Sequence, residues 1–403
     1  MGEHAYRMGG IKPGLKKNKE IHKLLSSNFI SFFGDQIYLI AVPLMVLSLS
    51  GSAIMMGLAA AAERLPVLMQ PAAGVLADRM DRRKLLLICD FGRFVLTGLL
   101  GILFLAEALP LWVLFCGAFS IGVFSQVYQT AQFAYVPNLV NEEDLAAVNS
   151  INSAILNTSV LMAPAAGGLV ISLYSPGAGL IINSLSFLAA FAAVAGISVP
   201  AAGVAKRSQS FWKDANEGFH FVLKTKPLFY TNLALLLSVF GTTLFLTILI
   251  FHLKDTIRLS VFEIGILLSF SGAGAIGGSL MAGYFNKRAS YRKLLFFSSF
   301  TGGISIVLFG FTGTFWLLVL LNSAGTAAAS IMNPCIATLR QNVTPDHLMG
   351  RVQATSRLMT WSLMPGAAFL AGLIAEGLGT SAVIIIGGMF SAAASAVYVK
   401  AGA

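Results

Sequence analysis

The stretch Gly74-Val75-Leu76-Ala77-Asp78-Arg79-Met80-Asp81-Arg82-Arg83-Lys84 decides the fold of this chain. It is a short charged segment between two long apolar runs, and its pattern returns 209 residues later as Gly283-Tyr284-Phe285-Asn286-Lys287-Arg288-Ala289-Ser290-Tyr291-Arg292-Lys293. The glycine, two arginines and the lysine coincide in the two copies. At a spacing of 204 residues, Gly168-Leu169-Val170 also matches Gly372-Leu373-Ile374. The chain therefore contains two similar halves that run in the same orientation.

The apolar runs around these copies exclude a soluble protein. Of the 403 residues, 56% are hydrophobic and only 11% are charged, and the mean hydropathy is +0.79. Soluble domains carry about 25% charged residues. Because a bilayer core needs roughly 20 apolar residues per helix, the sequence predicts an all-α membrane protein with twelve spans, near 24–48, 53–76, 84–106, 109–136, 145–173, 177–198, 227–253, 261–285, 292–311, 314–338, 348–374 and 379–399.

The distribution of basic residues predicts how these spans cross the membrane. If both termini are cytoplasmic, 20 of the 27 Lys and Arg residues lie in cytoplasmic segments and only Lys254 and Arg258 lie in outer loops. This asymmetry is the positive-inside pattern, so we expect a multi-pass protein of the cell membrane with cytoplasmic termini. The net charge of +10 then reflects topology and not nucleic-acid binding. No cleavable signal peptide is apparent in the first 23 residues.

The repeat also predicts the domain organisation. We expect a cytoplasmic segment at 1–23, a six-helix half at 24–198, a cytoplasmic linker at 199–226 and a second six-helix half at 227–403. Parallel repeats of this kind are typical of transporters that bind substrate between their halves. Cys89, Cys116 and Cys335 lie in apolar runs and are expected to be packing residues. The sequence predicts neither a cofactor nor a metal site.

Several motifs resemble the major facilitator superfamily. They are Gly74-x-Leu76-Ala77-Asp78-Arg79-x-x-Arg82-Arg83 between spans 2 and 3, Ala163-Pro164-Ala165-Ala166-Gly167-Gly168 in span 5, Val136-Pro137, and Pro345-Asp346-His347-Leu348-Met349-Gly350-Arg351-Val352 before span 11. The resemblance covers nearly the whole chain, and it points to the drug-exporter branch with macrolide-efflux proteins and the enterobactin exporter. It implies the twelve-helix fold of two pseudo-symmetric halves, with spans 1, 4, 7 and 10 lining a central cavity.

The resemblance assigns the charged loop to a cytoplasmic gate made by Gly74, Asp78, Arg79, Arg82 and Arg83. In this hypothesis Asp78 faces a helix N-terminus of the other half, where the helix dipole favours a negative charge, and the arginines tie spans together. The alternative is a topology signal of solvated basic charge. The second copy has Asn286-Lys287 in place of Ala77-Asp78, so its role as a gate is doubtful.

Three charged residues within spans 1 and 2 are candidates for proton coupling. Asp35 lies mid-span, where an ionised carboxylate costs about 2.5–3.5 kcal/mol on insertion scales. It either exchanges a proton for substrate or forms a fixed ion pair with Arg64, which lies at about the same depth in the neighbouring span 2. Glu63 is the other possible protonation site, or it pairs with Arg93. Many drug/proton antiporters of the superfamily carry an arginine in span 4, and residues 109–136 contain none, so we expect coupling through Asp35 or Glu63.

Other polar residues in the spans are assigned by their spacing. Asp90 and Arg93 are three residues apart and can pair on one helix face, which favours a structural role. Polar stripes on spans 4 and 10 must face protein or water. Arg357 in span 11 could contact an anionic substrate or a carbonyl. The expected cavity residues are therefore Gln126, Gln129, Asn322, Thr326, Ser330, Asn333 and Arg357. For the two stripes, the alternative is hydrogen bonding between helices alone. Pro164, Gly167 and Gly168, with Pro365, Gly366 and Gly372, allow kinks and close helix packing.

These features predict a secondary active exporter of amphipathic small molecules, working by alternating access as a proton antiporter. The alternative is a narrow-range exporter of a siderophore, lysophospholipid or other metabolite. The expected partners are a small-molecule substrate, protons and the lipid bilayer, with no nucleic acid, and we expect a monomer. An ATP-driven pump is disfavoured because no G-x-x-x-x-G-K-[ST] motif is present. A membrane enzyme is disfavoured because H-E-x-x-H and G-x-S-x-G are also absent.

Overall fold

Long apolar runs fold as helices because a helix satisfies its own backbone hydrogen bonds in lipid. The computed structural model describes residues 14–198, 211–286, 288–345 and 348–400, except for the side chains of Asp78, residues 211–215 and Asn286. The membrane helices are α1 (Lys19–Ser50), α2 (Ala53–Arg64), α3 (Gln70–Arg79), α4 (Arg82–Leu105), α5 (Leu111–Leu139), α6 (Leu145–Leu173), α7 (Pro176–Ala195), α9 (Lys226–Phe251), α10 (Val261–Asn286), α11 (Tyr291–Phe309), α12 (Phe315–Val343), α13 (Met349–Trp361), α14 (Met364–Leu378) and α15 (Thr380–Tyr398).

Two predicted spans are broken helices. Within the described residues, eleven helical segments are long and apolar enough to cross a membrane. The predicted span 53–76 is not among them, because it is divided into α2, the short 3-10 helix η3 (Leu65–Met69) and α3. Pro66, two residues after Arg64, removes a backbone donor from the helix. The span 348–374 is interrupted between α13 and α14, just before Pro365.

Local capping explains where several helices begin and end. Asn18 accepts a hydrogen bond from the Ile21 amide at the start of α1, and Asp81 accepts from two amides at the start of α4. Side-chain oxygens at the N-cap satisfy amides that have no partner within the helix. Gly51 ends α1 with φ of 61°, a left-handed conformation that glycine adopts at little cost. The turn at Asp81 is therefore both the predicted charged loop and a helix cap.

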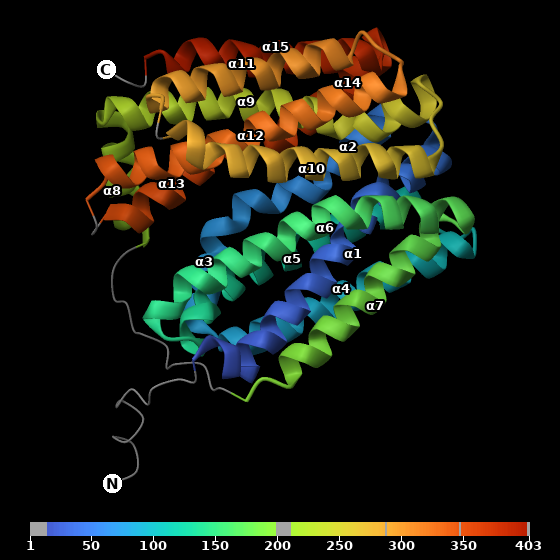
Figure 1. Ribbon diagram of the computed structural model, residues 1–403. Helices are drawn as coiled ribbons and strands as arrows, with labels where there is room; N and C mark the ends of the chain where they lie inside the picture. The colour runs from blue at the N-terminus through green and yellow to red at the C-terminus, as the bar shows by residue number, and fades with distance from the viewer. Residues whose placement is uncertain (1–13, 199–210, 287, 346–347, 401–403) are drawn as a thin grey trace.

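The helices pack in two groups that follow the repeat (Figure 1). Helix α1 packs on α6 and α7, and α4 packs on α5 and α7. In the second group α9 and α11 pack on α15, and α10 and α11 pack on α12. The predicted linker contains a helix that its polar composition did not predict, α8 (Phe211–Lys224), which packs against α13. Lys206 to Ser210 and the other predicted linker residues up to 210 lie outside the described residues.

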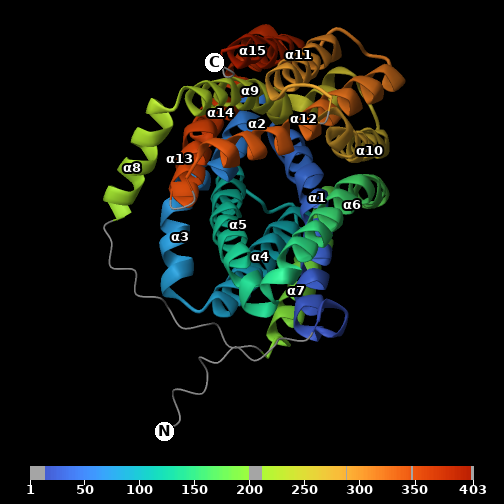
Figure 2. The same ribbon diagram turned by 60° about the vertical axis from the view of Figure 1, so that its left-hand side comes forward.

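The two groups meet at one end of the bundle. We call the end with the start of α1, the α3–α4 turn and the start of α11 the basic end, and the opposite end the far end. Helix α6 lies beside α10, as Figure 2 shows, and α2 lies beside α14. A Cβ atom at Gly168 would lie 2.9 Å from the Val261 carbonyl oxygen, and one at Gly372 would lie 2.7 Å from the Ala53 carbonyl oxygen.

These glycines are related by the repeat and lie in equivalent contacts. Gly168 and Gly372 therefore lie in close contacts between helices of the two groups, and Gly167 packs against Ile37 of α1. Towards the basic end the helices of the two groups diverge (Figure 1). A Cβ atom at Gly74 or Gly350 would have no described atom within 4 Å. The halves are thus in contact at the far end and apart at the basic end.

We expect Gly372→Val to open the far end. The added side chain would collide with the backbone of α2, which cannot give way as a flexible side chain can. Ser52 and Glu376 report this contact, since the Ser52 hydroxyl donates to the Glu376 carboxylate at 3.3 Å across the halves. The test uses a cysteine-free background that carries Ser52→Cys and Glu376→Cys. A short thiol cross-linker should join these two cysteines efficiently when Gly372 is kept and poorly when Gly372→Val is present.

Gly366→Val is the matched control for this experiment. Gly366 lies on the same helix, and a Cβ atom there meets nothing within 4 Å in the described structure. Its cross-linking yield should equal that of the parent. An unchanged yield in Gly372→Val would show that this glycine contact does not hold the far end together.

Candidate functional site

A buried ion pair lies at the centre of the first half. The Arg93 guanidinium and the Asp90 carboxylate, both on α4, are 2.6 Å apart and only 2% and 0% exposed. This confirms the predicted pairing. The guanidinium also lies between the rings of Tyr128 on α5 and Phe187 on α7, at 4.3 Å and 4.2 Å from their centroids. A cation between two aromatic faces gains electrostatic stabilisation beyond the ion pair, so Arg93 connects three helices.

Asp35 lies near this ion pair and not, as its depth in the membrane suggested, in a salt bridge with Arg64. In the described part of the chain its carboxylate forms no hydrogen bond or salt bridge, and the basic residue that acts on it electrostatically is Arg93. The alternative of a fixed Asp35–Arg64 pair is wrong. Arg64 instead donates to the Thr247 hydroxyl of α9 at 2.7 Å, across the two halves.

Glu63 is close enough to Asp35 for the two carboxylates to interact electrostatically. Tyr38, one helical turn after Asp35, is influenced by both acids, and its hydroxyl is buried without a hydrogen-bond partner among the described atoms. The possible Glu63–Arg93 salt bridge does not form in the described structure. The three candidate coupling residues therefore form one neighbourhood, in which sequence analysis missed Tyr38 and Thr247.

The basic loop ties helices of the first half together. Arg82 donates to the Asn138 side chain at 2.8 Å and to the Ala134 carbonyl at 3.1 Å, both on α5. Arg83 donates to the Val194 and Ala195 carbonyls at the C-terminus of α7, where the helix dipole favours a cation.

The other predicted gate residues make fewer contacts. Arg79 is exposed and has no hydrogen bond or salt bridge in the described part of the chain. The side chain of Asp78 lies outside the described residues, as do that of Asn286 and the whole of Lys287, Asp346 and His347. The gate therefore stays a prediction.

Arg357 bridges the two broken spans. Its guanidinium lies 4.3 Å from the Trp361 ring centroid and faces the side chain of Gln70 at the start of α3. With the amide oxygen oriented towards the guanidinium, Gln70 accepts from Nε at 2.9 Å. Arg357 therefore has partners from both halves, and Gln70 was not singled out from the sequence.

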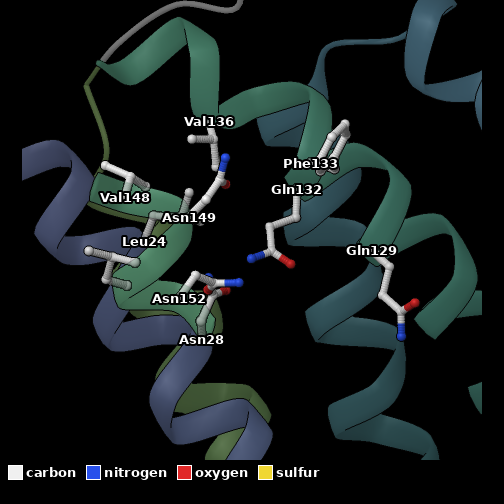
Figure 3. Close-up of a pocket in the computed structure, with 10 residues that line it drawn as sticks. Leu24, Asn28, Gln129, Gln132, Phe133, Val136, Val148, Asn149 and Asn152 are labelled. Carbon is white, nitrogen blue, oxygen red and sulfur yellow. The ribbon is translucent and has the colours of Figure 1, made fainter. Parts of the chain in front are cut away.

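A polar pocket lies between α1, α5 and α6 near the basic end (Figure 3). It has a volume of about 130 Å³. Five carboxamides line it: Asn28, Gln129, Gln132, Asn149 and Asn152. The rest of its wall is apolar and consists of Leu24, Leu25, Phe133, Val136 and Val148. The structure thus joins Gln129, a predicted cavity residue, to three asparagines that the sequence analysis did not identify.

The other predicted cavity residues lie outside this pocket. Gln126 is on α5, and its amide oxygen is buried without a hydrogen-bond partner among the described atoms. Asn322 is buried on α12, and Thr326 donates to its carbonyl oxygen at 2.8 Å. Ser330 is partly buried and Asn333 is exposed on the same helix. Their role in a substrate cavity stays a prediction.

Comparisons of the sequence place these features among transport proteins. The family model of the Major Facilitator Superfamily matches residues 24–369. Macrolide efflux protein A of Streptococcus pyogenes is 25% identical over 380 residues, covering 92% of each chain. The multidrug efflux pump Tap of Mycolicibacterium fortuitum is 25% identical, covering 87% of this chain and 88% of its own. The enterobactin exporter EntS of Shigella boydii is 26% identical, with 89% and 86% covered.

Comparisons of the fold agree. A bacterial homologue of the iron transporter ferroportin, solved in an inward-facing state, superposes with a TM-score of 0.78 at 19% identity, covering 95% of this chain and 98% of its own. A bacterial homologue of the lysosomal transporter Spinster gives 0.74 at 14% identity, with 96% and 98% covered. The helices have the major facilitator arrangement, and the family model spans most of the sequence. The chain belongs to the major facilitator superfamily, and it is a multi-span membrane transporter related to efflux proteins.

Proposed function

We propose that this protein exports amphipathic small molecules of the drug or macrolide type across the cell membrane by proton antiport, with both termini in the cytoplasm. The observation that carries this proposal is Asp35. It is a carboxylate within a membrane helix, beside a buried cation and without a hydrogen-bond or salt-bridge partner in the described part of the chain. A carboxylate held by a fixed ion pair would resist protonation, whereas Asp35 is available to exchange a proton.

The surroundings of Asp35 support coupling through the first half. Arg93 already has Asp90 as its close partner, so its interaction with Asp35 is of longer range. Arg93 of α4 lies against Tyr128 of α5, the helix that corresponds to the predicted span 4. A buried cation from α4 therefore lies next to the span that has no arginine of its own. Movement of a proton onto Asp35 would change the charge balance around Arg93, and this change provides a physical link between protonation and helix packing.

Alternating access by rocking of the two halves is supported by the distribution of contacts. The halves touch through small residues at the far end and diverge at the basic end. With cytoplasmic termini this arrangement is the inward-open state. The relatives named above include exporters of a macrolide, of drugs and of a siderophore. Arg357 was one of the features that would suit an anionic metabolite, and its contacts with Gln70 and Trp361 weaken that alternative.

Export by cells tests this proposal directly. In bacteria that lack their own drug exporters, expression of the chain should lower the accumulation of several chemically distinct amphipathic dyes and antibiotics, including a macrolide. A protonophore should abolish the effect because it removes the driving force. Persistence of export after the proton gradient collapses would refute antiport, and export of a single metabolite only would favour the narrow-range alternative.

A further inference from the structure

The carboxamide pocket contains a polar contact that both halves of the repeat share. Asn28 donates from Nδ2 to Oδ1 of Asn152 at 2.8 Å. At the spacing of 204 residues these positions correspond to Asn232 and Ser356, and Asn232 donates to the Ser356 hydroxyl at 3.0 Å. Asn28 and Asn232 are each only 1% exposed. This hydrogen bond is therefore a structural feature of each half.

The rest of the pocket distinguishes the two halves. Gln132 corresponds to Ile336, which is buried and apolar. Asn149 corresponds to Gln353, whose side chain accepts a hydrogen bond from Arg340. In the first half Val136 stands at the position of Arg340, so no such partner is present. In the first half, Gln132 and Asn149 form no hydrogen bond with the described residues, whereas the second half has an apolar residue or an internal hydrogen bond at these positions.

Gln132 is the residue that indicates a ligand. The residue is only 7% exposed, and its amide makes no hydrogen bond with the described residues. Figure 3 shows it pointing across the pocket towards Asn28, Asn149 and Asn152. Its amide atoms are not fully enclosed by protein, so they face the open space of the pocket. A group that enters the pocket can therefore pair with this amide without displacing a protein partner.

The lining chemistry defines the class of that group. No charged side chain lines the pocket, so an ionic group would be desolvated without a counter-charge. A purely apolar group would leave the carboxamides unpaired. Each carboxamide both donates and accepts, as hydroxyl groups do. The volume of about 130 Å³ is below the roughly 300–1,000 Å³ of drug-sized sites, so the pocket fits one ring of a larger molecule.

We propose that this pocket is a substrate subsite for an uncharged, hydroxylated ring, such as a sugar attached to an apolar body. The proposal rests on the export function proposed above, because it assigns the polar part of the substrate to the first half. The apolar walls formed by Leu24, Val136 and Val148 contact the C–H faces of the ring, while the carboxamides pair with its hydroxyl groups. The pocket thereby favours glycosylated compounds over their sugar-free counterparts.

Binding to the purified full-length protein in lipid nanodiscs tests the subsite. The probes are methylumbelliferyl glucoside and the methyl ether of the same coumarin, which are both uncharged and fluorescent. Equilibrium dialysis, corrected with empty nanodiscs, should show tighter binding of the glucoside. Gln132→Ile introduces the residue of the second half, and it should weaken glucoside binding about tenfold, the loss expected for one or two hydrogen bonds. Binding of the ether should be unchanged.

Two further variants separate this result from a change in folding. Gln132→Asn keeps a carboxamide and should retain most of the preference for the glucoside. Thr130→Val removes a hydroxyl from the same helix that bonds only to its own backbone, at the Gln126 carbonyl, and it should bind both probes as the parent does. Equal binding of the two probes by wild type, no binding of the glucoside, or equal weakening of both by Gln132→Ile would each overturn the subsite.

The subsite and the export function fail in different ways. If the cells show no export while the purified protein prefers the glucoside and loses that preference in Gln132→Ile, the export proposal is wrong and the subsite stands. If export is proton-driven and the glucoside has no advantage, the function stands and the subsite is wrong.

Discussion

Replacing Asp35 with asparagine is expected to abolish substrate accumulation while substrate binding persists. Asparagine has nearly the same shape as aspartate but cannot exchange a proton, so the packing of α1 is kept and the coupling step is lost. Gly34 already packs closely against Asn183 and Ser186 of α7, which leaves little room for any larger change here. In proteoliposomes with an imposed pH gradient, Asp35→Asn should equilibrate an exported dye without concentrating it.

Glu63→Gln is the matched control, because it removes a second carboxylate from the same neighbourhood. It should retain gradient-driven accumulation. If Asp35→Asn accumulates the dye like wild type and Glu63→Gln does not, Glu63 is the coupling acid. Loss of accumulation in both variants would mean that the two acids act together, and the assignment to Asp35 alone would be wrong.

Arg93→Met should be among the most destabilising single changes in the first half. It leaves the Asp90 carboxylate buried without its partner and removes the cation from between Tyr128 and Phe187. Removing one member of a buried ion pair costs about 3–5 kcal/mol. Thermal unfolding of the detergent-purified variant should show a strongly lowered Tm. Adding Asp90→Asn to Arg93→Met should recover much of this loss, because the unpaired charge is then removed.

The partly exposed ion pair between Glu20 and Lys23 provides a control with the same spacing. Its atoms are 3.1 Å apart, but the two side chains remain 23% and 35% exposed. Exposed pairs contribute about 0.2–1 kcal/mol, so Lys23→Met should change the Tm much less than Arg93→Met. Similar losses in the two variants would mean that burial of the Asp90–Arg93 pair adds nothing to stability.

The positions of most membrane helices could be predicted from the sequence because they depend on local properties. Apolar length sets each span, and the predicted span 145–173 coincides with α6. The breaks within spans 2 and 11 were not predicted as such. Apolar length does not reveal an interruption within a helix, although Pro66, Pro71 and Pro365 were visible in the sequence. The helix α8 was missed because hydropathy finds only helices that are apolar over most of their length.

The candidate site was harder to predict because its partners come from distant segments. The spacing of three residues was enough to pair Asp90 with Arg93. Equal depth in neighbouring spans was not enough to pair Asp35 with Arg64, since depth says nothing about which way a helix face points. The rotation of α2 directs Arg64 towards Thr247 of the other half.

The sequence by itself indicated a membrane transporter with an internal repeat, because apolar length and the repeat are both properties of the linear chain. Only the tertiary structure decided what the isolated polar residues do. In a low-dielectric interior, the nearest partner controls the energy of a charge or an amide. That partner is Thr247 for Arg64 and Gln70 for Arg357, while Gln132 has none among the described residues. These neighbours are fixed by how the helices are rotated against one another, which a hydropathy pattern does not specify.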